Sequence, residues 1–264
     1  MTRIDAYPQE RIFLQPLRDG SGAVQGYRVR GNAARNWARS SELFDDFLLG
    51  IWNGAPWFVT SVGVGSGFDA TVQTMNDDAD GRRGQGSIHG YTGTTAIGSA
   101  DYHGYATVRA GSGTRVRLAQ RIGHLGLATV GEDYVMRAGF GFPSLLVDPA
   151  TNGCLFLYNR AAHGDFWICQ FWANGGLVAE SVTTKAPAAS TTYQVLEIDI
   201  AAEGDLVSYF VDGDLVAEQD IDVASRWTGD CMFGAGIQKT AGLTSRSMVV
   251  DYIRLLLDGA TDRG

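Results

Sequence analysis

The sequence predicts an all-β protein, and three observations support this fold class. Short apolar segments separated by turn residues recur about every 8–15 residues from Glu42 onward, as in β-sandwiches and barrels. The chain contains 35 glycines and only six prolines, which fits many tight turns between short strands. No segment has the 3.6-residue apolar periodicity of a convincing amphipathic helix. We therefore expect a sandwich or barrel over residues 42–264.

The clearest strand signals lie between residues 193 and 220. The segment Y-Q-V-L-E-I-D-I places apolar residues at every second position, as in a strand with one face in water: Leu196, Ile198 and Ile200. A polar turn at 203–205 and the Asp-Gly pair at 212–213 separate the apolar runs that follow. The stretch therefore predicts three consecutive antiparallel strands.

Residues 1–41 differ in composition from the rest of the chain. They contain seven arginines and a D-G-S-G turn signal at 19–22, with only weak apolar periodicity. We interpret this segment as a short N-terminal arm that attaches the protein to something else. The alternative is that it forms an ordinary first pair of strands of the same domain.

Composition disfavours several classes of function. The formal net charge of −8 and the pI of about 4.9 argue against nucleic-acid binding, because phosphates repel an acidic chain. No apolar run reaches the ~18–20 residues of a transmembrane helix, so membrane insertion is not expected. Residues 1–10 lack the apolar core of a secretory signal, which indicates synthesis in a cytoplasm. Cys154 and Cys169 are accordingly expected to be buried thiols.

Several segments carry a family resemblance through their order along the chain. They are D-D-F-L (45–48), H-G-Y-T-G-T-T-A-I-G-S-A (89–100), R-A-G-F-G-F (137–142), N-G-C-L-F-L-Y (152–158), the 193–220 stretch and V-V-D-Y-I-R-L (249–255). In this order they resemble the concanavalin A-like lectin/glucanase superfamily, in the versions found in bacteriophage virion proteins. The resemblance implies a two-sheet antiparallel jelly-roll sandwich with a curved face. It implies no single activity, because this superfamily includes lectins, hydrolases, lyases and structural modules.

The same resemblance implies a non-enzymatic structural protein of the virion, such as a head decoration, a fibre or a tail-associated component, made in the bacterial host cytoplasm. Its expected partners are other virion proteins, reached through residues 1–41, and host-surface glycans bound by the sandwich. Such proteins usually form symmetric homo-oligomers, and we expect a trimer. The alternative function is a polysaccharide-cleaving enzyme, a glucanase or lyase of the same superfamily.

Glu197, Asp199 and Glu203 resemble the catalytic motif of the glucanases. Those enzymes carry Glu-x-Asp-x-Glu or Glu-x-Asp-x-x-Glu on one strand, with two glutamates about 5–5.5 Å apart as nucleophile and general acid/base. Here Glu203 comes one residue later and abuts a turn signal. Six strand positions separate the Cα atoms of Glu197 and Glu203 by roughly 20 Å. We therefore predict that the chain has no catalytic residues and that these acids lie on a solvated strand face.

Sugar binding usually requires an exposed aromatic ring with polar groups beside it, because the C–H faces of sugars stack on such rings. The sequence offers these candidates: Trp52, Trp57, Tyr91, Tyr102, His103, Tyr105 and Trp167. The segment 166–173 carries aromatic residues on both faces, with Phe166 and Trp172 on one and Trp167 and Phe171 on the other. One of these sets must face the core, and core packing is the alternative role for any single tryptophan.

Arg115, Arg117 and Arg121 fall on one face of the segment T-R-V-R-L-A-Q-R-I, opposite its apolar residues. On an acidic protein, such a row could contact the carboxylates of a neighbouring subunit or an acidic glycan. The alternative is a solvated strand face.

Asn76, Asp78 and Asp80 precede Gly81 in the spacing of the first half of a calcium-binding loop. Oxygen ligands at alternate positions can surround a hard cation such as calcium, and the glycine permits the sharp turn. The match fails at the twelfth position, where Ser87 replaces the bidentate glutamate. The alternative is an acidic surface loop that holds no metal.

Overall fold

The computed structural model describes residues 13–18, 24–30, 40–45, 57–71, 87–104, 113–141, 145, 152–188, 192–227 and 231–259. Packing divides the chain into two units, residues 1–40 and residues 41–264. The first unit contains an antiparallel hairpin of β1 (Phe13–Arg18) and β2 (Val24–Arg30). Its role as an attachment arm stays a prediction.

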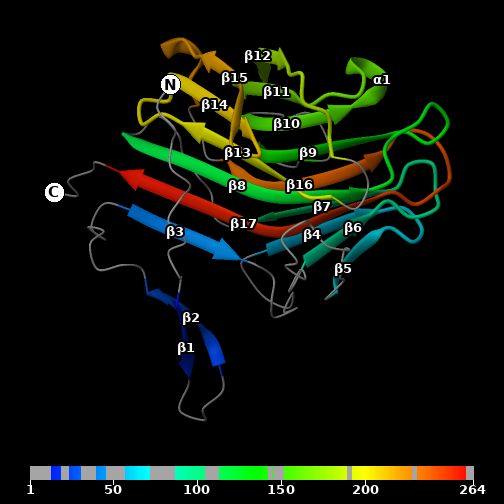
Figure 1. Ribbon diagram of the computed structural model, residues 1–264, viewed down its shortest axis with the longest axis horizontal. Helices are drawn as coiled ribbons and strands as arrows, with labels where there is room; N and C mark the ends of the chain where they lie inside the picture. The colour runs from blue at the N-terminus through cyan, green and yellow to red at the C-terminus, as the bar shows by residue number, and fades with distance from the viewer. Residues whose placement is uncertain are drawn as a thin grey trace. The chain divides into compact units, whose positions relative to one another are not determined.

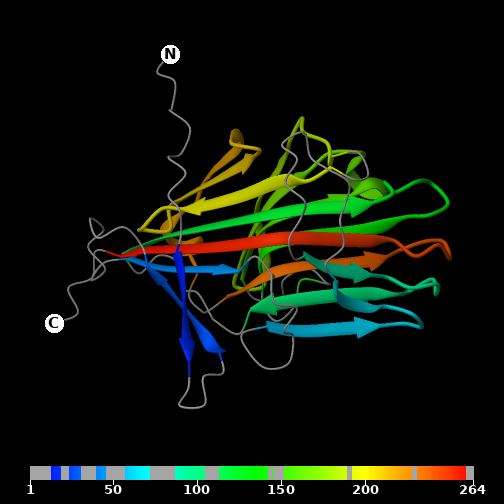
Figure 2. The same cartoon turned by 60° about the horizontal axis from the view of Figure 1, so that its bottom comes forward.

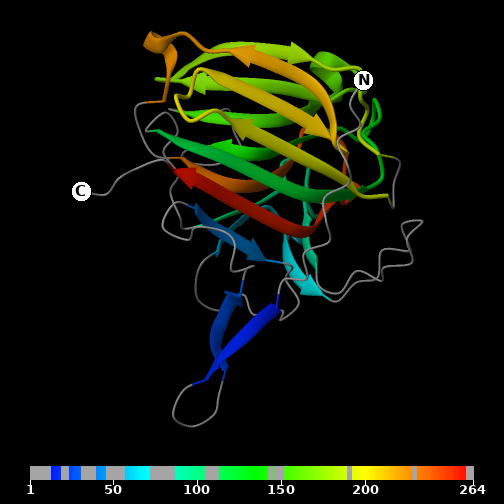
Figure 3. The same cartoon turned by 60° about the vertical axis from the view of Figure 1, so that its left-hand side comes forward.

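The second unit contains two stacked antiparallel sheets (Figures 1 and 3). The strands of the seven-stranded sheet are, in spatial order, β12 (Gly176–Val182), β11 (Ile168–Ala173), β10 (Gly153–Asn159), β9 (Tyr134–Gly141), β16 (Met232–Lys239), β7 (Ser99–Gly104) and β4 (Trp57–Val62). Those of the eight-stranded sheet are β15 (Asp214–Asp220), β14 (Leu206–Val211), β13 (Gln194–Ile200), β8 (Thr114–Leu125), β17 (Ser247–Gly259), β6 (Ser87–Tyr91) and β5 (Gly67–Thr71); in addition, β3 (Ser40–Asp45) pairs with β17. The predicted two-sheet sandwich is confirmed.

Helical structure among the described residues is limited to two short segments. The helix α1 (Arg160–His163) is capped at its N-terminus by Asn159, whose side chain accepts a hydrogen bond from the Ala162 N–H. The second segment is a single 3₁₀ turn, η1 (Val223–Ser225). None of the helices in the described part is long and apolar enough to cross a membrane.

The stretch from 193 to 220 folds as its alternation predicts. Strands β13, β14 and β15 pair in sequence as an antiparallel meander. Leu196, Ile198 and Ile200 are buried between the sheets, whereas the acids between them lie on the outer face. The Asp-Gly turn adopts the left-handed backbone region at both of its residues, with φ of 53° at Asp212 and 82° at Gly213.

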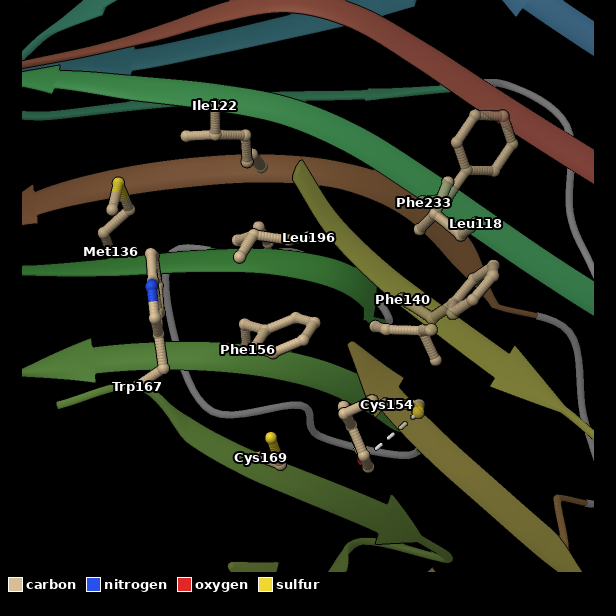
Figure 4. Packing of buried hydrophobic residues seen from close by; sticks show 14 of the residues in the cluster. Leu118, Ile122, Met136, Phe140, Cys154, Phe156, Trp167, Cys169, Leu196 and Phe233 are labelled. Atoms are coloured by element: carbon tan, nitrogen blue, oxygen red, sulfur yellow. Dashed lines mark hydrogen bonds between the residues drawn. The ribbon is translucent and has the colours of Figure 1, made fainter. Parts of the chain in front are cut away.

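The core lies between the two sheets and is rich in aromatic rings (Figure 4). Phe156 packs edge-on against Trp167 and Tyr209, with ring centroids 6.0 and 5.4 Å apart. Cys154 and Cys169 lie beside these rings as buried free thiols, which confirms their prediction. Burial raises the pKa of the Cys154 thiol to about 12, so it stays protonated at neutral pH.

Three buried polar side chains of the eight-stranded sheet donate hydrogen bonds to backbone carbonyls of the other sheet. They are Gln120 to Gly234 O (2.9 Å), Tyr209 to Gln170 O (2.8 Å) and Gln219 to Cys169 O (3.1 Å). A buried side-chain donor without a partner would cost about 1–3 kcal/mol. These bonds therefore fix how the sheets are placed on each other, and with them the strands that carry the candidate site (Figure 2 shows the stack from another side).

Candidate functional site

Two of the predicted sugar-binding aromatic residues lie in the core instead. Tyr102 is fully buried on the inward face of β7, and Trp167 is 1% exposed and packs on Phe156 and Tyr158. Because neither ring reaches the surface, neither is placed to stack on a sugar. Tyr91, at the end of β6, is half-buried.

Several predicted site residues fall where the structure gives no side-chain description. Trp57 begins β4, but its side chain lies outside the described residues. Trp52, Tyr105, Asn76, Asp78 and Asp80 lie outside the described ranges altogether. Within the described ranges, no three acidic, histidine or cysteine side chains are grouped so as to hold a metal ion. The calcium loop therefore stays a prediction.

The outer face of the seven-stranded sheet presents the other set of residues from the aromatic strand. On β11, Cys169 and Phe171 point into the core, so Gln170 and Trp172 point outward. Phe171 is held inside by Trp227, whose ring stacks on it with centroids 5.7 Å apart. Trp172 is only partly buried at this face.

A chain of hydrogen bonds fixes the Trp172 ring. Its indole N–H donates to Gln170 Oε1 (3.1 Å), and Gln170 Nε2 donates to Glu180 Oε2 on the edge strand β12 (2.7 Å). Gln170 is buried, while Glu180 is exposed. We call Trp172, Gln170 and Glu180 the Trp172 platform. Through Gln170 it links an aromatic ring to an exposed carboxylate that can accept hydrogen bonds, and this combination of groups is the one expected of a sugar-binding surface.

Trp172 is not among the predicted sugar-binding residues. The period-2 pattern places Trp172 on the same face as the polar Gln170, whereas Trp167 shares its face with Cys169 and Phe171. The face that carries a glutamine is the better candidate for the outside. This signal was available in the sequence.

His103 lies elsewhere on the same outer face. Its Nδ1 is 3.3 Å from Asp101 Oδ2, and the Asp101 side chain is buried. The strand registers place His103 in one row with Gly234, Gly139, Leu155 and Gln170. Four strand spacings of about 4.8 Å separate His103 and Gln170 by ~19 Å. The two positions therefore cannot contact the same sugar unit.

The three predicted surface arginines meet carboxylates of their own chain on the outer face of the eight-stranded sheet. Arg115 forms a two-point pair with Asp199, and Arg117 Nε lies 3.2 Å from the same carboxylate. Arg121 bonds Asp251 at 2.7 Å, and its guanidinium lies 4.5 Å from the centre of the Tyr193 ring. The hydrogen bond to Asp199 raises the pKa of Arg115. These pairs reduce the positive charge that an acidic ligand would meet.

Glu197 lies on this second outer face, two residues before Asp199. Burial raises the pKa of the Glu197 carboxyl, and the nearby Arg117 opposes this effect. Glu203 is exposed in the turn after β13, off the strand as predicted. The three acids therefore do not form a continuous motif along one strand.

Replacing Glu197 with glutamine is expected to raise the free energy of unfolding at pH 7. A folded-state pKa above the ordinary value means that the ionised carboxyl destabilises the fold, and glutamine mimics the protonated form. The gain should shrink as the pH falls and vanish below the ordinary pKa of 4.5. Urea unfolding at pH 7 and pH 4 measures it, with Glu203→Gln as the exposed control. A lower stability of Glu197→Gln at pH 7 would mean that the attraction to Arg117 outweighs burial.

Comparisons with known proteins give structural neighbours only. No protein-family model and no curated protein sequence matches the chain. The carbohydrate recognition domain of Emp47p is similar with a TM-score of 0.54 and 13% identity, over 87% of this chain and 100% of that one. Peanut lectin gives 0.55 and 12%, over 83% and 97%. The endo-1,3-beta-glucanase from Streptomyces sioyaensis gives 0.53 and 13%, over 86% and 100%.

These likenesses define the class of fold that surrounds the site. The protein has the jelly-roll sandwich fold of these lectins and of this glucanase. Both lectins and glucanases share this fold, and identities this low carry no activity from one protein to another.

Proposed function

We propose that the protein is a non-enzymatic carbohydrate-binding sandwich and that it contacts glycans through the Trp172 platform. The observation that carries this proposal is the partly buried Trp172 ring, which is oriented by Gln170, whose amide also binds the exposed Glu180 carboxylate. A ring that is already held in place loses little side-chain entropy on binding. The carboxylate supplies acceptors for sugar hydroxyls.

The charges of the protein favour uncharged glycans. Glu180 would repel the carboxylates of acidic sugars, and the chain as a whole carries a formal charge of −8. The arginines that an acidic glycan would need are already paired with Asp199 and Asp251. We therefore assign the platform to neutral sugars.

A glycan array probed with the full chain tests the proposal. Saturable binding to neutral glycans is expected, with little signal on sialylated, sulfated or uronic-acid glycans. Running the array with calcium and with a chelator also tests the predicted loop at residues 76–80. No binding to any glycan, or binding to acidic glycans only, would contradict the proposal.

The biological setting that we propose is the surface of a bacteriophage particle. Its support is the sequence resemblance to virion proteins. Residues 1–41 would bind other virion proteins, and the sandwich would face the host surface in a homo-oligomer.

Removing residues 1–41 should abolish incorporation into particles while leaving a folded sandwich that still binds glycans. Particles assembled with the truncated chain, analysed by immunoblot, measure incorporation, and circular dichroism measures the fold. The full chain serves as the control. Incorporation of the truncated chain at the level of the full chain would show that the attachment surface lies elsewhere.

A polysaccharide-cleaving enzyme is the second candidate function. It is favoured by Glu197, a half-buried carboxyl with a raised pKa two residues before Asp199 on one outer face. Two carboxyl groups in different environments are the usual requirement for glycoside hydrolysis. Against it, Asp199 is engaged by two arginines. Release of reducing ends from β-glucans by the wild type, abolished in Glu197→Gln, would establish the enzyme and overturn the non-enzymatic function.

A further inference from the structure

One end of the sandwich exposes five large aliphatic side chains, and the least exposed of them is Leu127 (39%). We call this surface the loop end and define it as the turns between β4 and β5 (63–66), β6 and β7 (92–98), β8 and β9 (126–133) and β16 and β17 (240–246). These turns lie side by side at the right of Figures 1 and 2. Each turn has one largely exposed aliphatic residue: Val64 (73%), Ile97 (72%), Val130 (84%) and Leu243 (65%). Grouped exposed apolar residues mark interaction surfaces.

The loop end is held in shape by hydrogen bonds between its turns. They run from Thr94 N–H to Val64 O (3.2 Å), Thr92 N–H to Arg246 O (2.9 Å), Asp133 N–H to Ala241 O (3.1 Å) and Thr244 N–H to Glu132 Oε2 (2.9 Å). Beneath them, the buried Lys239 donates from Nζ to Gly93 O (2.6 Å). A surface braced in this way loses little conformational entropy when it associates.

Charge is nearly absent from the loop end. Its sequence contains three charged residues, Glu132, Asp133 and Arg246. Asp133 is buried, and the Glu132 carboxylate accepts hydrogen bonds from the Leu243–Thr244 backbone. Glu132 and Arg246 are half-buried, so the exposed positions of the four turns carry apolar residues, glycines and hydroxyl side chains, on a chain whose formal net charge is −8.

We propose that the loop end is the surface through which one copy of this chain docks on a second copy, in a two-fold dimer that replaces the trimer expected from the family resemblance. Two copies with equal negative charge repel each other, so they associate most readily where both surfaces are uncharged. In a two-fold contact the same surface of both copies is buried. The exposed aliphatic side chains of both loop ends then leave water together, which doubles the apolar area that one loop end would bury alone. An anionic membrane is a poorer occupant, because it attracts clusters of Lys and Arg, and these turns contain only Arg246.

This contact leaves the Trp172 platform accessible. By strand register, Trp172 lies level with Gly153, Gly141 and Met232, whereas the loop end adjoins Tyr134 and Lys239 at the opposite ends of β9 and β16. Seven strand positions, roughly 23 Å, separate the two levels. The inference goes beyond the glycan-binding proposal and does not depend on it.

Sedimentation velocity of the full chain over a concentration series tests the inference. We expect a concentration-dependent dimer of the wild type and, in the double variant Ile97→Asp/Val130→Asp, a dimer dissociation constant raised roughly tenfold or more. The matched control is Val182→Asp/Leu215→Asp, two exposed aliphatic residues on the edge strands β12 and β15. The control should dimerise like the wild type, and both variants should keep the wild-type circular dichroism spectrum.

Three results would overturn the inference. The first is a wild type that stays monomeric over the whole series. The second is loss of the dimer in the Val182→Asp/Leu215→Asp control, or an unchanged dimer in the loop-end variant, since either places the contact elsewhere. The third is flotation of the wild type with phosphatidylcholine or phosphatidylserine vesicles that Ile97→Asp/Val130→Asp abolishes, which would assign the loop end to lipid. If the loop-end variant unfolds, the single changes Val64→Ser and Leu243→Ser replace it.

Discussion

Replacing Trp172 with alanine is expected to weaken glycan binding by roughly 30-fold or more, because truncating a central tryptophan at a binding surface costs about 2 kcal/mol or more. The fold should survive the change. Trp172 lies on the outer face, and the bond that it accepts from the Trp227 indole N–H is made by its backbone carbonyl. Isothermal titration with the neutral glycan that binds most tightly on the array measures the affinity.

Two further variants test whether the loss of glycan affinity is caused by removing part of the Trp172 platform. Phe166→Ala removes another exposed aromatic ring next to the same strand and should leave affinity unchanged. Gln170→Met keeps most of the side-chain volume but removes the hydrogen bonds to Trp172 and Glu180, so an intermediate loss of affinity is expected. Equal affinities of the wild type and Trp172→Ala would contradict the assignment of the site.

Replacing Gly139 with alanine is expected to lower the free energy of unfolding by about 3 kcal/mol or more, a large part of the ~5–15 kcal/mol that stabilises a typical domain. Gly139 has a φ of 142°, and a Cβ there would lie 2.5 Å from Cys154 O and 2.8 Å from Ile198 Cδ1. Relief would require movement of a strand backbone at the centre of the seven-stranded sheet. Urea unfolding at pH 7 measures the loss.

The variant Gly213→Ala measures the cost of a positive φ without the cost of a steric clash. Gly213 also has a positive φ, 82°, but a Cβ there would meet no atom within 4 Å. We expect it to cost about 1 kcal/mol, for the left-handed backbone alone. Equal losses in the two variants would show that the sheet accommodates a side chain at Gly139.

The sandwich could be predicted from the sequence because the alternation of apolar and polar residues along a strand indicates which face of the strand is exposed to water. The same rule could have placed Tyr102 in the core, since it alternates with the polar Asp101 and His103. The rule predicts less firmly which face of β11 is buried, because both faces of this strand carry aromatic rings. There the decision depends on partners distant in sequence: Trp227 stacks on Phe171, and Tyr209 bonds the Gln170 carbonyl.

The candidate site and the arginine row were harder to predict because their partners come from other strands. Alternation placed Arg115, Arg117 and Arg121 on one face, but Asp199 and Asp251 follow Arg115 and Arg121 by 84 and 130 residues. No local sequence pattern predicts ion pairs between residues so far apart in the chain. Likewise, Glu180 meets Gln170 only because β11 and β12 pair in a register with an irregularity between Phe171 and Trp172.

The most direct test of the proposed function is a glycan titration of the ¹⁵N-labelled full chain, observed through the tryptophan indole N–H signals, with Trp172→Phe to assign one of them. We predict that the Trp172 signal shifts saturably with the neutral glycan, while the signals of the core residues Trp167 and Trp227 stay in place. Saturable binding that leaves the Trp172 signal unchanged would contradict the account.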